Sequence, residues 1–172
     1  GPRNAMVAVI PTPYADLGGP PARRDRAPPI VVWIGNVGNE EYLELVANLR
    51  DAMPDIALST DMIVGFPGET DADFEETLTL TSTVRYHSMF SFKYSPRPNT
   101  LALKRLPDDV PEEEKTRRIV ALQALQRELQ GEIYRQAIGR EEQVLVESRS
   151  RRRDWELSGR TSGNTVVNFA GD

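Results

Sequence analysis

The fold class of this chain is decided by Ser59-Thr60-Asp61-Met62-Ile63-Val64-Gly65-Phe66-Pro67-Gly68-Glu69-Thr70. Its first part belongs to a strand that we predict from Ile56 to Gly65, because side chains of different character alternate along it. The larger and more apolar face carries Leu58, Thr60, Met62 and Val64. Thr70, three residues before Asp73, predicts an acidic helix start, and this helix is expected to run to about Val84.

The turn between this strand and this helix holds Gly65 and Gly68 and is a candidate ligand site. Ligands of α/β folds bind at the carboxyl edge of the sheet, and glycine lets the backbone approach a ligand closely. From the glycine spacing alone, the alternative is an ordinary turn in which both glycines only supply unusual dihedral angles. The residues around the two glycines have to distinguish these two interpretations.

Helix and strand patterns alternate on both sides of this stretch. Apolar residues at three- and four-residue steps predict a helix that begins at Glu40 and ends at Pro54. These residues are Tyr42, Leu45, Val46, Leu49 and Met53. A second strand is predicted from Ser88 to Ser95, with Phe90, Phe92 and Tyr94 on one side. Helices and strands that alternate with short links are typical of parallel α/β units, so this half has the α/β class.

The remainder predicts a long helix and a small antiparallel module. After an irregular connector from Asn99 to Val110, we expect a helix from Pro111 to about Ile138, closed by Gly139. Its apolar face is predicted to hold Ile119, Leu122, Leu125, Leu129 and Ile133. Three strands are then predicted at Gln143 to Glu147, Trp155 to Arg160 and Thr165 to Phe169, with a turn at Ser162-Gly163-Asn164. Three strands are too few to close a barrel.

Composition limits the classes of function. The 172 residues carry a net charge of −5, with 39% hydrophobic and 27% charged residues, as in globular proteins. No apolar run approaches the ~20 residues of a membrane-spanning helix, so we expect a cytoplasmic protein without membrane contact. The sequence has no cysteine, which excludes cysteine-held clusters within it. A negative chain does not favour nucleic-acid binding over its whole surface, but a local basic patch is compatible with it.

Residues 1–39 differ in composition from the rest. They hold the prolines at positions 2, 11, 13, 20, 21, 28 and 29, and only Ile30 to Ile34 has the character of a strand. We interpret this segment as an atypical leader that is disordered or artefactual, with translation from a displaced reading frame as a further alternative. Residues 40–138 and residues 139–172 form the two other predicted regions.

The quoted stretch resembles the fifth-strand element of radical S-adenosylmethionine enzymes, in which an apolar residue and Gly-x-x-Gly-Glu lie beside the adenine. Ile63, Gly65, Gly68 and Glu69 match this element. Asp61 replaces a glycine of the general pattern, in the form typical of the methylthiotransferase branch. The resemblance implies that these five residues bind the adenosyl part of the cofactor.

Three further segments resemble the same branch in order and spacing. Phe92 to Thr100 is similar to its Tyr-Ser-x-Arg-x-Gly-Thr element, with Asn99 in place of glycine, and asparagine tolerates a left-handed backbone. Asp108 to Lys115 resembles the linker before the long helix, and Trp155 to Phe169 resembles the start of the RNA-binding TRAM barrel. The resemblance implies the C-terminal part of a partial parallel (β/α) barrel of the radical SAM type, then a long helix and an incomplete TRAM-like antiparallel β-barrel.

Arginines and aromatic residues supply the other candidate contacts. Arg97 suits a carboxylate or a phosphate and is assigned to the cofactor. Tyr94 and Ser95 are expected to face the ligand side and are assigned to the substrate, tRNA. The candidate tRNA contacts are Arg149, Arg151, Arg152, Arg153, Trp155 and Arg160, because guanidinium groups pair with phosphates and an indole stacks on bases. The alternatives are an ordinary surface arginine and a solvated arginine loop. No catalytic residue or metal ligand is assigned, and the single histidine, His87, is interpreted as structural.

The family that the chain resembles adds a methylthio group to C2 of N6-isopentenyladenosine beside the tRNA anticodon. It uses S-adenosylmethionine and two [4Fe–4S] clusters, whose cysteine ligands are absent here. We therefore expect a fragment that is inactive alone and whose partner is the anticodon stem-loop of tRNA. Alternatives are the branches that modify threonylcarbamoyladenosine or an aspartate of a ribosomal protein, and a non-catalytic RNA-binding fragment.

Overall fold

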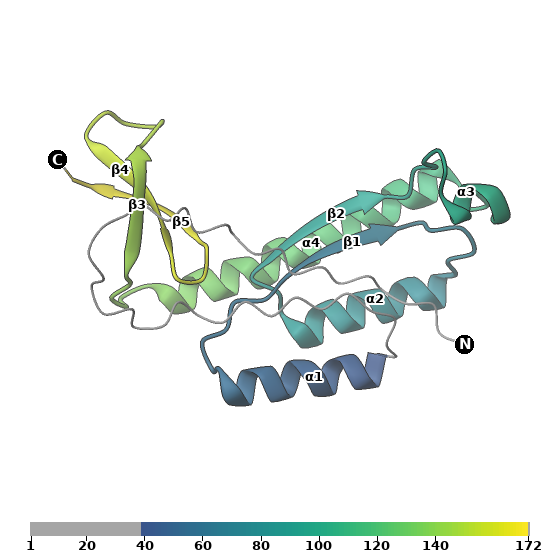
Figure 1. Ribbon diagram of the computed structural model, residues 1–172, viewed down its shortest axis with the longest axis horizontal. Coiled ribbons are helices and arrows are strands. Elements are labelled where there is room, and N and C mark those ends of the chain that lie inside the picture. The colour runs from purple at the N-terminus through teal and green to yellow at the C-terminus, as the bar shows by residue number, and fades with distance from the viewer. Residues whose placement is uncertain (1–38, 172) are drawn as a thin grey trace.

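The computed structural model describes residues 39–171, and Figure 1 shows how their helices and strands are arranged. The chain forms α1 (Asn39–Ala52), β1 (Ser59–Val64), α2 (Asp71–Val84), β2 (Ser88–Lys93), α3 (Leu101–Arg105), α4 (Glu112–Ala137), β3 (Val144–Arg149), β4 (Glu156–Thr161) and β5 (Val166–Ala170). The interpretation of residues 1–39 and the possible strand at 30–34 fall outside the described residues, apart from Asn39, which begins α1.

The first half is an α/β unit, as the sequence predicts. β1 and β2 pair in parallel, from Ser59 beside Ser88 to Val64 beside Lys93. The connection between them runs through α2, as parallel pairing requires. α4 lies along β2 and contacts α2, and α1 packs beside α2 (Figure 1).

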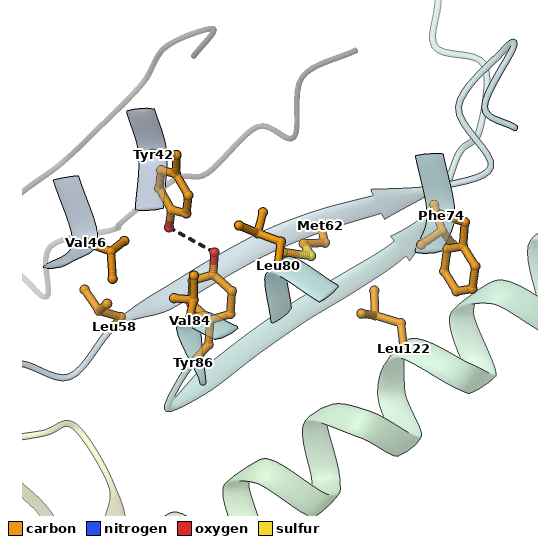
Figure 2. Close-up of a cluster of buried hydrophobic side chains, with 10 residues drawn as sticks. Tyr42, Val46, Leu58, Met62, Phe74, Leu80, Val84, Tyr86 and Leu122 are labelled. Carbon is orange, nitrogen blue, oxygen red and sulfur yellow. Dashed lines mark hydrogen bonds between the residues drawn. The ribbon is translucent and has the colours of Figure 1, made fainter. Parts of the chain in front are cut away.

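The hydrophobic core lies between β1 and the helices (Figure 2). The predicted inner face of β1 is confirmed, because Leu58, Thr60, Met62 and Val64 are all buried. They pack with Tyr42, Val46, Phe74, Leu80, Val84, Tyr86 and Leu122. Full burial of one large apolar side chain stabilises a fold by about 1.5–3 kcal/mol, so this cluster anchors β1 firmly.

Two tyrosines bring hydroxyl groups into this core. The Oη atoms of Tyr42 and Tyr86 lie 2.9 Å apart and form a hydrogen bond (Figure 2). Burial raises the pKa of both phenols, so both stay protonated at neutral pH. The pair therefore joins α1 to the start of β2 without burying a charge.

The predicted start of α2 is confirmed by a capping box. Thr70 is the N-cap, its Oγ1 accepts from the backbone N–H of Asp73, and the Asp73 carboxylate accepts from the N–H of Thr70. Such a cap stabilises a helix by about 1 kcal/mol. It also fixes the direction in which the chain leaves the glycine-containing turn.

The connector from Asn99 to Val110 is not irregular throughout, and our prediction was wrong there. Leu101–Arg105 form α3, which lies beyond the carboxyl ends of β1 and β2 (Figure 1). Thr100 caps it by accepting from the N–H of Leu103 at 3.3 Å. The sequence Leu-Ala-Leu-Lys-Arg consists of strong helix formers, which is sufficient for one turn once a cap is present.

The long helix is confirmed, but its predicted inner face is only partly correct. The buried residues of α4 are Lys115, Arg118, Leu122, Gln126 and Leu129. Leu122 and Leu129 were expected, whereas Ile119, Leu125 and Ile133 are only partly buried. The buried face of α4 therefore differs from the predicted apolar face. The reason is that its first turns pack ion pairs, not aliphatic side chains, against the α/β unit.

The C-terminal module is a three-stranded antiparallel sheet in the order β3-β4-β5, as predicted. The turn at Ser162-Gly163-Asn164 is also confirmed, with the N–H of Thr161 donating to the carbonyl of Thr165 at 3.0 Å. Asn164 has φ +62°, and asparagine is among the residues that adopt this conformation most readily. Among residues 39–171, no helix is long and apolar enough to cross a membrane.

Candidate functional site

The turn that follows β1 is closed by its own glutamate. Gly65 has φ +70° and Gly68 has φ +78°, a region that favours glycine. The Oε2 atom of Glu69 accepts the N–H of Gly65 at 2.6 Å and the N–H of Phe66 at 3.1 Å. Residues 65–69, called the glycine turn below, thus have a defined conformation that the glycines permit and that the Glu69 carboxylate stabilises.

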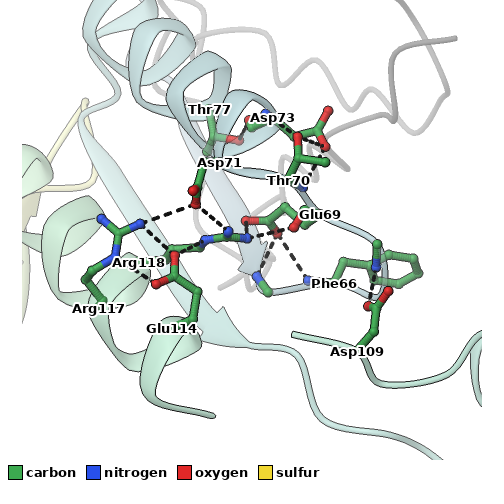
Figure 3. A network of polar contacts seen from close by, with 12 residues as sticks. Phe66, Glu69, Thr70, Asp71, Asp73, Thr77, Asp109, Glu114, Arg117 and Arg118 are labelled. Carbon is green, nitrogen blue, oxygen red and sulfur yellow. Dashed lines mark hydrogen bonds and ion pairs between the residues drawn. The ribbon is translucent and has the colours of Figure 1, made fainter. Parts of the chain in front are cut away.

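The other carboxylate oxygen of Glu69 meets an arginine of α4 (Figure 3). Nη1 of Arg118 lies 3.0 Å from Oε1 of Glu69 and donates to the carbonyl of Glu69 at 3.0 Å. The Arg118 side chain is only 4% exposed and that of Glu69 is 12% exposed. Ion pairs with Asp71 at 2.8 Å and Glu114 at 2.7 Å complete the guanidinium contacts.

The segment before α4 makes two further contacts with the glycine turn. Oδ1 of Asp109 accepts the N–H of Gly68 at 2.6 Å (Figure 3). The Lys115 side chain passes so close to Gly65 that a Cβ atom at Gly65 would overlap Lys115 Cγ. Lys115 ends in an ion pair with Asp108, at 2.6 and 2.7 Å to its two oxygens. The space beside Gly65 therefore accommodates a protein side chain.

The outer face of the sheet is open and apolar next to this turn. Asp61 stands beside Phe90 in the parallel register, and Ile63 stands beside Phe92. Ile63 is 53% exposed, Phe90 62% and Phe92 51%. Two of the predicted cofactor residues, Asp61 and Ile63, thus lie on one accessible face that leads to the glycine turn.

The residues after β2 are placed differently from one another. Tyr94 is buried, with its ring edge-on to Phe66 at 5.1 Å and the Lys115 ammonium 5.4 Å from its centroid. Tyr94 therefore packs beneath the glycine turn and does not present its ring to the open face. Ser95 and Arg97 are exposed. Asn99 has φ +67°, which confirms that asparagine takes the left-handed conformation at this point.

The arginine cluster predicted to contact tRNA is partly engaged within the module. Arg149 donates to the carbonyl of Asp154 at 3.1 Å, and Arg160 pairs with Glu147 at 3.2 Å. Arg153 lies over the Trp155 ring at 5.3 Å. Arg151 and Arg152 are exposed, and no side-chain partner for them is found within residues 39–171. These two guanidinium groups are the most available for an external phosphate.

His87 has a structural environment, as interpreted from the sequence. The imidazole Nδ1 of His87 accepts the backbone N–H of Leu58 at 3.2 Å. The backbone N–H of His87 donates to the carbonyl of Leu58 at 2.8 Å. Burial, and then the charge of Arg50, lower the pKa of His87. A neutral imidazole is needed for Nδ1 to accept, so the bond and the pKa agree.

The chain does not provide the ligands of an iron–sulfur cluster. Such clusters are held by cysteine thiolates, and the sequence has none. Within the described residues, no group of three or more histidine, aspartate or glutamate side chains is arranged to hold a metal ion. The clusters therefore do not fit this chain, whereas the open face beside the glycine turn is compatible with an organic ligand.

The sequence prediction of the site missed the residues that hold the turn, which are Asp108, Asp109, Lys115 and Arg118. A signal for two of them existed, because Lys115 and Arg118 fall on the same helical face as Leu122 and Leu129. A cation at a core-facing position requires a carboxylate partner. Which carboxylate it would be was not evident, since Glu69 lies 49 positions away.

Comparison with known proteins defines the class first. A family model of the radical SAM superfamily matches residues 25–81, which include β1, the glycine turn and most of α2. The match also extends upstream of Glu40, into the segment that we interpreted as atypical. Residues 25–81, with β1 and the glycine turn, are thus similar to the radical SAM superfamily.

Curated relatives then narrow the class. The chain is 50% identical over 131 residues to the tRNA-2-methylthio-N(6)-dimethylallyladenosine synthase of Yersinia enterocolitica, 52% over 134 residues to that of Myxococcus xanthus, and 51% over 133 residues to that of Geobacter metallireducens. These alignments cover 76–77% of this chain and 27–30% of the relatives. The chain is homologous to the radical SAM methylthiotransferases and spans under a third of their length.

Proposed function

We propose that residues 40–172 are the part of a radical SAM tRNA methylthiotransferase that borders the adenosyl group and contacts tRNA. This proposal rests on sequence identity. Over about three quarters of its length, the chain is about 50% identical to enzymes named as synthases of 2-methylthio-N(6)-dimethylallyladenosine in tRNA. The reaction of the intact enzyme would add a methylthio group to C2 of this tRNA base. The α/β unit would be the last part of a partial barrel, and β3 to β5 the start of a TRAM-like barrel.

The open face of β1 supports the adenosyl assignment. Ile63 offers an accessible apolar surface for a purine, and Asp61 lies on the same face. The glycine turn adds backbone at the carboxyl edge of the strand, where α/β folds bind ligands. Arg97 is exposed after β2 and would meet the carboxylate of the methionine part. S-adenosylmethionine supplies the adenosyl radical and the methyl group in this family, and neither iron–sulfur cluster would be held by this chain.

The exposed arginines support the tRNA assignment. Arg151 and Arg152 have accessible guanidinium groups, and Arg153 stacks on an exposed indole. Guanidinium groups that stack on or flank aromatic rings bind phosphates and bases of single-stranded RNA loops. We infer that the loop between β3 and β4, which carries these residues, contacts the anticodon stem-loop in the cytoplasm.

Binding of the purified chain to a tRNA anticodon stem-loop tests the RNA assignment. Replacing Arg151, Arg152 and Arg153 with alanine should lower the affinity and reduce the steepness of its salt dependence by roughly the number of lost phosphate contacts. The matched control removes the same charge elsewhere, by replacing the exposed Arg127 and Arg135 of α4, and Arg140 just after it, with alanine. Equal affinity of the two triple variants would refute the assigned patch.

A non-catalytic role of the chain as it stands is the second candidate. It is favoured by the absence of cysteine, because no thiolate is available for the cluster that cleaves the cofactor. Under this alternative the chain would bind RNA without modifying it. Mass spectrometry of tRNA nucleosides after incubation with the chain and S-adenosylmethionine tests this candidate, since detection of the methylthio product would refute it.

A further inference from the structure

The contacts of the glycine turn come from one short segment of the chain. Asp109 accepts from Gly68 and Arg118 pairs with Glu69 (Figure 3). Lys115 fills the space beside Gly65. Each contact is made by the loop before α4 or by its first two turns. The glycine turn is thus braced from outside its own α/β unit.

Both carboxylate oxygens of Glu69 are engaged within the protein. Oε2 accepts two backbone N–H groups of the turn and Oε1 accepts from Arg118. A carboxylate held by this number of donors at low exposure is a structural anchor. The match of Glu69 to a cofactor motif is therefore explained without direct contact to a ligand.

Arg118 is the centre of the bracing. It is nearly buried and contacts Glu69, Asp71 and Glu114, which come from the turn, from α2 and from α4 itself. Its guanidinium also lies 5.6 Å from the centre of the Phe74 ring. A planar group with five donors can join three carboxylates in this way, and a lysine cannot.

We propose that Arg118, with Lys115 and Asp109, is a positioning residue that sets the conformation of the glycine turn. The inference rests on the proposed function in one respect, namely that the turn borders the adenosyl group. The same helix, α4, is 26 residues and about 39 Å long, and a six-residue link from Ala137 to Val144 connects it to β3.

Amide hydrogen exchange measured by NMR on the purified chain tests the positioning role. In Arg118→Ala, the amides of Gly65 and Phe66 should exchange at least ~10-fold faster relative to the amide of Leu80 in α2, because the Glu69 anchor is released. In Asp109→Ala, only the amide of Gly68 should respond. Arg118→Lys should restore part of the protection.

Arg117→Ala is the matched control, since Arg117 is adjacent and pairs with Glu114 and Asp71 but does not contact the turn. Unchanged exchange in Arg118→Ala, equal acceleration in Arg117→Ala, or equal acceleration of Leu80 would each overturn the proposal. Calorimetry with S-adenosylmethionine separates the two claims. Local acceleration without any cofactor binding by the unmodified chain would refute the adenosyl role and leave the positioning role in place.

Discussion

Nη1 of Arg118 and Oε1 of Glu69 lie 3.0 Å apart, although 49 positions separate the two residues in the sequence. The pair joins the long helix to the glycine turn and is largely shielded from water. Replacing either partner alone would leave a poorly solvated charge, which is more costly than the loss of a surface ion pair. The glycine turn and α4 should therefore behave as one unit in folding.

Replacing Gly65 with alanine should destabilise the fold. The left-handed φ of +70° costs a side-chain-bearing residue about 1–2 kcal/mol, and the overlap with Lys115 adds to this cost. Urea unfolding followed by circular dichroism gives the change in the free energy of unfolding. Gly131→Ala is the control, with an expected effect of opposite sign. Gly131 lies inside α4, and a Cβ atom added there would meet no neighbour, so alanine should stabilise the fold by about 0.5–1 kcal/mol. A similar loss of unfolding free energy in Gly65→Ala and Gly131→Ala would contradict the geometry of the turn.

Leu122→Ala should lower the free energy of unfolding by about 2–5 kcal/mol, because Leu122 is fully buried where α4 meets the core. Val120→Ala, two residues earlier at a position that is 56% exposed, should change it by less than ~0.5 kcal/mol. The same unfolding assay measures both. A large effect at Val120 and a small one at Leu122 would show that α4 presents another face to the sheet.

Stability should decrease as the pH falls below about 6.5, the ordinary pKa of histidine, because His87 stays neutral in the fold but takes up a proton when unfolded. The unfolded state then binds more protons, so this contribution is present above the ordinary pKa and declines towards the lowered pKa of the folded state. The slope cannot exceed ~1.4 kcal/mol per pH unit for one proton. His87→Asn should remove this part of the pH dependence, since asparagine can accept the Leu58 N–H without titrating in this range.

The assignment of the His87 slope can be checked directly. His87 is the only histidine of the sequence, so its ring protons give a single NMR titration. Its midpoint should lie below 6.5. A midpoint above 6.5 would contradict the burial of the ring.

Anaerobic reconstitution with iron and sulfide should leave the purified chain without the absorbance of a [4Fe–4S] cluster, because it has no cysteine. The full-length Myxococcus xanthus relative, treated in the same way, serves as the comparison. Iron bound in stoichiometric amount to this chain, with a cluster spectrum, would contradict the prediction.

Local patterns were sufficient to predict most of the α/β unit. The alternation along β1 identified its buried face, and Thr70 with Asp73 identified the start of α2, because both signals act over a few residues. The inner face of α4 was only partly predicted, because Lys115 and Arg118 were not assigned to it although they share a helical face with Leu122 and Leu129. Their charges are paired with Asp108 and Glu69, and the pairing of Arg118 with Glu69, 49 positions away, is not expressed in any local period.

The same limit applies to the candidate site. The motif at residues 59–70 identified the glycine turn and its open strand face. The motifs, however, assigned Glu69 and Tyr94 to the ligand side. The structure places the Glu69 carboxylate within the turn and the Tyr94 ring beneath it. A motif shows which residues recur together, whereas the contacts show which of them remain accessible.

The most direct test of the proposed function is a chimaera in which residues 40–172 replace the homologous part of the Myxococcus xanthus enzyme, with the rest of that enzyme retained. Mass spectrometry of tRNA from cells that contain only this chimaera should detect the 2-methylthio product. The same chimaera with Arg151, Arg152 and Arg153 replaced by alanine should yield less of it. A folded chimaera that carries its clusters but leaves the tRNA unmodified would contradict the proposed function.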